Sequence, residues 1–400
     1  MTRWNYPQLR LDVTALDDNI ATMAAWCAQR DVRLAPHVKT TMSAPIIERQ
    51  LAAGAVALTV ATYSQAATLA SWGHPRILIA NEVVEAAVLR RMSADLDRDP
   101  DLEIRFLVDS PAGVRAAHDA FGPGRRPAEV LLDVGAAGGR TGVRGRQDAR
   151  SLAEAVAASP HLRLVGVAGY EGVVPNEHTD DVIARVDEHC ARTRDVFLDV
   201  TDLFATDAPV FTMGGSAFPD RVVRYLPDTA AVPGTVRLLR PGCYVTHDHG
   251  TYAHLNPVPG LTPALSVHAL VLSTPEPGIA VINAGKRELP HDAGLPIVLA
   301  VRDARGTPRS ATATVARLFD HHAVLHHHVD GLRVTDRVEL GISHPCSAFS
   351  RWSSYLAVAA DGDLDVWTTD FTGGTPHPAT VRVLNPWARE GCHFLLFSVL

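Results

Sequence analysis

Lysine is nearly absent from this sequence. Of the 37 lysine and arginine residues in the 400-residue chain, only Lys39 and Lys286 are lysines. Because arginine is the ordinary cation here, these two positions need a separate explanation. Arginine cannot lose its proton in a protein and cannot form an imine, whereas a desolvated lysine amine can be a Schiff-base nucleophile. Chance retention of two surface lysines is the alternative explanation.

Other features are missing as well. The arginines are scattered and the formal net charge is -7, so no nucleic-acid-binding surface is predicted. The five cysteines are far apart and odd in number, which disfavours a disulfide framework. No apolar run reaches the length of a membrane span, and the first residues contain no apolar signal-peptide core. The sequence therefore predicts a cytoplasmic protein that binds neither nucleic acid nor membrane.

The first 250 residues alternate apolar runs with amphipathic stretches, which is typical of parallel strands joined by helices. An initial helix is expected over residues 16–30. Eight strands are then expected near residues 32–38, 56–61, 77–80, 103–108, 129–134, 163–168, 209–213 and 235–240. Eight strands with intervening helices fit a closed α/β barrel of the (β/α)₈ type, over residues 10–252, better than an open sheet.

The pattern changes after residue 252, where prolines separate short runs rich in valine, leucine and isoleucine. Spaced runs of this kind indicate a mainly β domain, which we place at residues 253–371. Residues 1–13 are a candidate addition to this domain. Residues 372–400 form a tail to which the sequence assigns no role.

Polar residues gather after the predicted barrel strands, where enzymes of this architecture build their sites. Lys39 follows the first strand, Arg140 the fifth and Tyr170 the sixth. The loops after strands seven and eight offer backbone N–H groups and a hydroxyl suited to a phosphate monoester, and they contain Gly215, Ser216, Gly242, Cys243 and Tyr244. Two such loops together with a lysine after strand one form a specific combination.

These segments resemble the fold-type III pyridoxal 5′-phosphate enzymes, which include alanine racemase, D-threonine aldolase and D-serine dehydratase. The resemblance covers about residues 10–371. It is greatest to the D-serine dehydratase and amino-acid deaminase branch, and it rests on the segments PHVKT, GGRTG, GYEG, MGGSAF, RPGCYVTHDHG, NAGKREL and ISHPCSAF.

The resemblance implies a role for each matched residue. Lys39 would be the Schiff-base lysine and the base that takes the Cα proton of the substrate. Arg140 would approach the cofactor, although the loop from Asp133 is longer here than in the racemases and aldolases. Tyr170 would contact the cofactor or merely fill the barrel mouth. The remaining cofactor contacts would come from His37, Gly215, Ser216, Gly242, Cys243 and Tyr244.

A second candidate site is His344-Pro345-Cys346 in the β domain. An imidazole and a thiolate two residues apart on an extended segment can form half of a zinc site, but a buried cysteine beside an ordinary histidine is the more common meaning of this pattern. By resemblance, D-serine dehydratases place a metal-binding His-x-Cys here, whereas the aldolases have His-x-Asp. Cys346 therefore favours a dehydratase.

Together these features predict β-elimination of D-serine or a related 3-hydroxy-D-amino acid to a 2-oxo acid and ammonia. Pyridoxal phosphate would be the electron sink, and Zn²⁺ or another divalent metal on His344 and Cys346 would assist hydroxide departure. A D-3-hydroxyamino-acid aldolase, an amino-acid racemase and a non-catalytic carrier of pyridoxal phosphate are the alternatives. The resemblance also implies a homodimer, because relatives complete each site with residues of the partner.

Two further features of the sequence are better explained by structural roles than by metal binding or catalysis. The histidine-rich segment 321–328 is more typical of a solvated surface than of a metal site. Within it, LFDHHAVL resembles a family segment that ends in a histidine facing the active site, which makes His322 the best candidate for such a role. Lys286 lies in a predicted turn of the β domain, where an ion pair across a domain or dimer boundary is expected.

Overall fold

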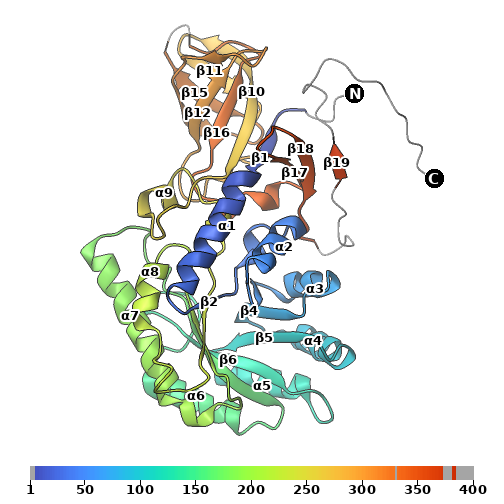
Figure 1. The fold of residues 1–400 in the computed structure, drawn as a ribbon, viewed down its shortest axis with the longest axis vertical. Coiled ribbons are helices and arrows are strands. Elements are labelled where there is room, and N and C mark those ends of the chain that lie inside the picture. The colour runs from blue at the N-terminus through green and yellow to red at the C-terminus, as the bar shows by residue number, and fades with distance from the viewer. Residues whose placement is uncertain (1–4, 329–330, 373–380, 384–400) are drawn as a thin grey trace, which may run out of the picture.

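The protein consists of a barrel and a mainly β part beside it (Figure 1). The computed structural model describes residues 5–328, 331–372 and 381–383. Most of the predicted tail, residues 372–400, lies outside the described residues. The barrel and the β part meet above the carboxyl ends of the barrel strands, which is where the sequence placed the candidate site residues.

Eight parallel strands form the barrel, as the sequence predicted. In the order β2-β9-β8-β7-β6-β5-β4-β3 each strand pairs with the next, and a bridge between His37 and Thr59 closes the ring between β2 and β3. The strands are β2 (Arg33–Leu34), β3 (Leu58–Val60), β4 (Arg76–Glu82), β5 (Glu103–Val108), β6 (Ala128–Val134), β7 (Leu162–Gly169), β8 (Val210–Met213) and β9 (Val236–Leu239).

Helices cover the outside of the barrel. The first one, α1, begins three residues earlier than expected because Asp12 caps it, with its carboxylate accepting the N–H of Ala15 at 3.0 Å. The helices are α1 (Val13–Ala28), α2 (Ala44–Ala52), α3 (Tyr63–Ser71), α4 (Ala86–Arg98), α5 (Pro111–Phe121), α6 (Arg146–Ala157), α7 (Asp180–Asp199), α8 (Pro219–Val222) and α9 (Thr251–Leu255).

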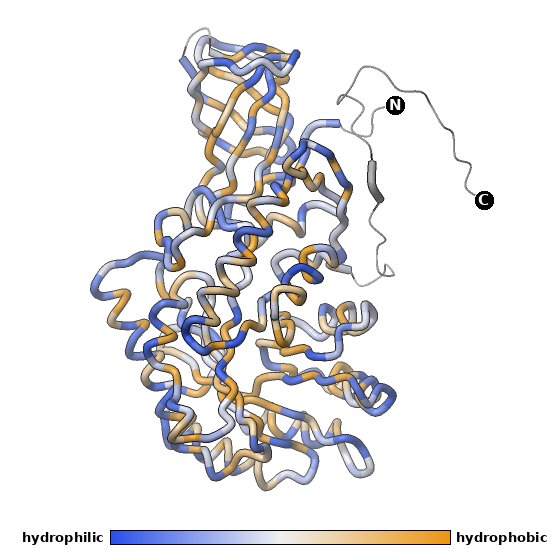
Figure 2. Tube along the Cα trace, in the orientation of Figure 1, coloured by the Kyte–Doolittle hydropathy of each residue, from blue (hydrophilic) through white to orange (hydrophobic). Residues whose placement is uncertain are grey.

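A small apolar cluster fills the inside of the barrel, separate from the main core between strands and helices. Alternation along each strand produces this division, because neighbouring residues face opposite sides of the sheet. Figure 2 shows apolar residues along many of the strands. The inner cluster lies below the candidate site and consists of Ala35, Leu78, Leu107, Leu131, Val165, Ala168, Val210 and Leu238.

The mainly β part is a sheet of eleven strands. Its strand β1 (Gln8–Asp12) comes from the beginning of the chain and pairs antiparallel with β10 and parallel with β17. The other strands are β10 (Leu265–Glu276), β11 (Ile279–Ile282), β12 (Ile297–Arg302), β13 (Pro308–Arg309), β14 (Ala313–Leu318), β15 (Ala323–His327), β16 (Arg337–Gly341), β17 (Ser354–Val358), β18 (Leu364–Thr368) and β19 (Val381–Val383). The predicted change from an α/β barrel to β structure is confirmed.

Candidate active site

A cavity of about 330 Å³ lies at the carboxyl ends of the barrel strands. Its size is at the lower end of the range typical of small-molecule sites. Nine of the residues singled out in the sequence line it, and they come from both parts of the chain: His37, Lys39, Arg140, Tyr170, Gly215, Ser216, Gly242, Cys243 and Cys346.

Lys39 lies in a single 3₁₀ turn, Val38–Thr40, directly after β2. The N–H of His37 donates to the carbonyl of Pro241 at 3.1 Å, which ties the segment before this turn to the loop after β9. Among the described residues, no hydrogen bond or ion pair engages the amine of Lys39. A half-buried primary amine without a protein partner is therefore available inside the cavity.

The loops after β8 and β9, where the sequence predicts a phosphate cradle, are joined by hydrogen bonds. Ser216 Oγ accepts the N–H groups of Gly242 at 3.2 Å and Cys243 at 3.0 Å, so a hydroxyl and two backbone donors converge. A Cβ atom at Gly242 would lie 2.5 Å from the carbonyl oxygen of His37, and only glycine fits there. Backbone donors and a hydroxyl of this kind suit a phosphate group.

The buried carboxylate of Glu171 holds the loop after β8 in place. Glu171 accepts the N–H groups of Gly214 at 3.1 Å and Gly215 at 2.7 Å. The sequence analysis did not select Glu171, although it adjoins Tyr170. Because both donors belong to the loop that carries Ser216, Glu171 fixes the backbone of the cradle.

Arg240 is the second residue that the sequence analysis missed. It is buried, lines the cavity, and donates to Thr212 Oγ1 at 2.7 Å and to the carbonyl of Gly169 at 2.8 Å. Burial, followed by the nearby charges of Lys39 and Arg240, lowers the pKa of His37 well below its ordinary value. The imidazole beside Lys39 is thus neutral at physiological pH, and its Nδ1 is buried without a hydrogen-bond partner.

These residues fit pyridoxal phosphate. The cavity combines an available lysine amine, a phosphate cradle that tolerates no side chain at Gly242, and the unsatisfied Nδ1 of His37. Arg140 lies 4.8 Å above the ring of Tyr170, so cation–π attraction holds this pair together at the cavity wall.

The carboxyl groups of Asp133 and Glu82 interact with each other, and Asp133 lines the cavity. Thr141 Oγ1 donates to Asp133 Oδ2 at 2.9 Å. Burial, and then the charge of Asp133, raises the pKa of Glu82 to about 8. Burial also raises the pKa of Asp133. This pair therefore retains a proton near neutral pH.

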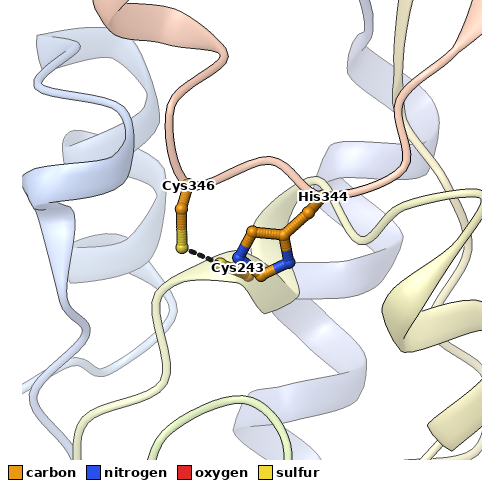
Figure 3. A group of neighbouring side chains, drawn as sticks. All are labelled: Cys243, His344 and Cys346. Carbon is orange, nitrogen blue, oxygen red and sulfur yellow. Dashed lines mark hydrogen bonds between the residues drawn. The ribbon is translucent and has the colours of Figure 1, made fainter. Parts of the chain in front are cut away.

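His344 and Cys346 lie close together and are joined by a third residue, Cys243 (Figure 3). One ligand atom from each lies within 4.8 Å of the others, and the two sulfur atoms are 3.4 Å apart. Hydrogen bonding from Cys243, and then from His344, lowers the pKa of Cys346 to about 5. A thiolate and an imidazole in contact fit a zinc ion. Among the described residues, this is the one cluster of three such side chains.

Three residues that the sequence analysis discussed do not line this cavity. Tyr244 is buried, but its hydroxyl accepts a hydrogen bond from Gln50 Nε2 at 2.9 Å in a separate cavity beside α1 and α2, so its side chain does not reach the cofactor cavity. His322 is exposed and does not line the cavity. Lys286 is exposed in the β part, and no ion pair involves it within the part of the chain that the structure describes.

Comparison with known proteins gives two family matches. Residues 11–246 match the family described as "Alanine racemase, N-terminal domain". Residues 264–358 match the family described as "Putative serine dehydratase domain". The boundary between the matches falls where the barrel gives way to the β sheet. In the described residues, no helix has the length and apolar character needed to cross a membrane.

Individual relatives match over most of the chain. D-threo-3-hydroxyaspartate dehydratase of Delftia sp. (strain HT23) is 27% identical over 390 residues, covering 90% of this chain and 96% of its own, and its solved structure superimposes with a TM-score of 0.73. D-threonine aldolase of Arthrobacter sp is 26% identical over 300 residues, covering 74% and 76% of the two chains. The crystal structure of D-threonine aldolase from Filomicrobium marinum is 27% identical, covers 91% of this chain and 95% of its own, and gives a TM-score of 0.75.

Proposed function

The chain belongs to the family of the alanine racemase N-terminal domain and is a pyridoxal-phosphate-dependent lyase; from that premise we propose that it dehydrates a 3-hydroxy-D-amino acid. The relatives are a dehydratase and aldolases that act on 3-hydroxy-D-amino acids, and they indicate this general class of substrate. The specific reaction proposed is β-elimination from D-serine or a similar compound, giving a 2-oxo acid and ammonia.

One observation carries the proposal: Lys39 and Cys346 line the same cavity. An amine that can remove the Cα proton and a thiol that can hold a metal ion are therefore available to one substrate. An elimination needs both functions, since a proton leaves Cα and hydroxide leaves Cβ.

The residues of the barrel would hold the cofactor and the substrate. Bound pyridoxal phosphate supplies an electron sink for the negative charge that develops at Cα. Lys39 would hold it through its amine, and Ser216 with the N–H groups of Gly242 and Cys243 would hold its phosphate. Lys39 Nζ is also the group positioned to take the Cα proton. The neutral His37 stands beside Lys39 and adds no second positive charge.

The residues of the β part would act on the leaving group. His344 and Cys346 would hold a Zn²⁺ ion, which supplies Lewis-acid stabilisation of departing hydroxide. Asp248 Oδ2 lies 3.8 Å from His344 Nδ1, so a carboxylate stands on the side of the imidazole that faces away from the thiols. By the family resemblance described for the sequence, His-x-Cys rather than His-x-Asp at this position also favours a dehydratase over an aldolase.

Product analysis tests the proposal. The purified protein, loaded with pyridoxal phosphate, is incubated with D- and L-3-hydroxyamino acids in the presence and absence of a chelator. A dehydratase releases 2-oxo acid and ammonia from the D-compounds only, and chelation stops it. Glycine and an aldehyde as main products would instead identify an aldolase, and a mixture of enantiomers would identify a racemase. A protein that binds the cofactor but yields none of these products would be a carrier.

Aldol cleavage is the second candidate function. The observation in its favour is the similarity to two D-threonine aldolases, one of which superimposes with a TM-score of 0.75. Retro-aldol cleavage needs the β-hydroxyl to lose its proton rather than to depart as hydroxide. The two reactions therefore share Lys39 and differ at the metal.

The proposed assembly is a homodimer with twofold symmetry, in which the partner completes each site. This proposal rests on the family resemblance described for the sequence. Light scattering at micromolar concentration should give twice the mass of one chain. A fully active monomer would refute this assembly.

A further inference from the structure

Cys243 has two functional groups that face different neighbours. Its backbone N–H donates to Ser216 Oγ and so belongs to the phosphate cradle. Its side chain points toward Cys346 instead, with the sulfur atoms 3.4 Å apart (Figure 3). Binding of a phosphate at this turn uses the backbone and leaves the thiol unused.

The distances match those of a shared metal ion. Two sulfurs bound to one zinc ion at about 2.3 Å and tetrahedral angles lie about 3.8 Å apart. The two sulfur atoms are 3.4 Å apart, and the three ligand atoms all lie within 4.8 Å of one another. Small movements of the side chains would bring these atoms to the distances expected around one zinc ion. Figure 3 shows one ring nitrogen of His344 directed toward the thiols, while its Nδ1 lies 3.8 Å from Asp248 Oδ2.

We propose that Cys243 is a third protein ligand of the metal, so that two thiolates and one imidazole bind the ion. This inference rests on the metal site of the proposed function and adds a ligand from the barrel to the His-x-Cys pair of the β part. Three protein ligands leave one position of a tetrahedral ion open to the cavity, as in catalytic zinc sites.

Two consequences follow from the third ligand. The metal connects the turn after β9, which carries Cys243, to the loop after β16, which carries His344 and Cys346. Metal binding should therefore stabilise the contact between the barrel and the β part. A site with two thiolates also selects zinc over Mg²⁺ and Mn²⁺, since soft sulfur ligands disfavour hard ions.

The experiment compares Cys243→Ser with Cys27→Ser in the full-length protein. Cys27 is a buried free cysteine on α1 that does not line the cofactor cavity, and it controls for the loss of one thiol. Each protein is loaded with Co²⁺ in place of zinc, because sulfur-to-cobalt charge-transfer absorption increases with the number of thiolate ligands. The shift in melting temperature on adding Zn²⁺ is measured on the same samples.

The charge-transfer absorption of Cys243→Ser should fall to about half, because one thiolate of two remains, and its zinc affinity should fall about 100-fold. The stabilisation by Zn²⁺ should shrink with the affinity. Cys27→Ser should match the unsubstituted protein in all three measurements. Cys243→Ala provides a second variant, and retained binding of pyridoxal phosphate shows that either variant is folded.

Each other outcome has a distinct meaning. Equal charge-transfer absorption and zinc affinity in Cys243→Ser and the unsubstituted protein would refute the third ligand and leave the His-x-Cys metal site intact. Failure of the reduced, unsubstituted protein to bind Co²⁺ or Zn²⁺ would refute the metal site altogether. A disulfide between Cys243 and Cys346 in the purified active enzyme, detected as two missing thiols after denaturation, would also refute the ligand role.

Discussion

The two halves of the active site differ in how hydrogen bonds hold their side chains and loops in place. In the barrel half, Glu171 accepts two backbone N–H groups, and Arg240 donates to a hydroxyl and a carbonyl. In the half that joins the β part, His344 Nδ1 and Asp248 Oδ2 are buried without a hydrogen-bond partner in the described residues. The loop that carries Ser216 is thus fixed by hydrogen bonds within the barrel, although His37 Nδ1 in that half also lacks a partner within the described residues. Among the same residues, no such hydrogen bond fixes Nδ1 of His344 in the other half.

The largest effect should follow from removing the amine in the barrel half. Lys39→Ala should reduce activity about 10³-fold or more, because the general base and the cofactor-binding amine are the same atom. The visible absorption of lysine-bound pyridoxal phosphate should disappear as well. Absorption spectra and initial rates measure both effects. Lys286→Arg is the matched control, and an unchanged spectrum in Lys39→Ala would refute the assignment.

The next effect concerns the metal half alone. His344→Ala should lower elimination about 100-fold, since Lewis-acid stabilisation is lost, while the cofactor spectrum stays unchanged. Metal analysis should find close to one zinc per chain before the substitution and none after it. His322→Ala, a substitution on the exposed surface, serves as the control. Loss of cofactor binding in His344→Ala would show that the two halves are not independent.

A smaller effect is expected from the support of the phosphate cradle. Glu171→Ala leaves the buried N–H groups of Gly214 and Gly215 without an acceptor and should cost about 2 kcal/mol of stability. Weaker binding of pyridoxal phosphate should accompany this loss, because the same loop carries Ser216. Thermal unfolding and cofactor titration are the measurements. Glu171→Gln keeps one acceptor oxygen and should lose less; equal losses in both variants would indicate that charge matters instead.

The last expected effect is a change in the pH dependence of stability. The pKa of Glu82 is about 8 in the folded protein, above the ordinary value of 4.5. Between these values the folded protein keeps a proton that the unfolded chain has released, so stability falls as pH rises through this window. Glu82→Gln removes this dependence. Its melting temperature should therefore decline less than that of the unsubstituted protein between pH 5 and pH 8, and parallel declines would contradict the assignment.

The sequence predicts the barrel half better than the metal half. Each barrel strand appears as a local apolar run before a helical stretch, and the scarcity of lysine draws attention to Lys39. Arg240 shows no such signal, because it is one of many arginines and its burial depends on partners in other strands. Tyr244 adjoins Cys243 in the same turn, but the turn directs its side chain toward α2, and no sequence pattern specifies that direction.

Cys243 illustrates the same limit. Its position in a glycine-containing loop predicts a role at the phosphate, and the sequence separates it from Cys346 by about a hundred residues. Only the packing of the β16 loop over the end of β9 brings the two sulfurs within 3.4 Å. When metal ligands come from two distant parts of the chain, no short sequence motif contains them all, and sequence analysis cannot detect the set.

The placement of β1 has a consequence for biosynthesis. This strand is synthesised before the other strands of its sheet, and its parallel partner β17 begins at Ser354. At about 5 to 20 residues per second, β1 waits roughly 20 to 70 s for that partner. During this time Leu9 and Leu11, both buried in the finished sheet, have no strand on that side to cover them. The barrel can be fully translated in the interval, so the β sheet that contains β1 is completed only after the barrel has been synthesised.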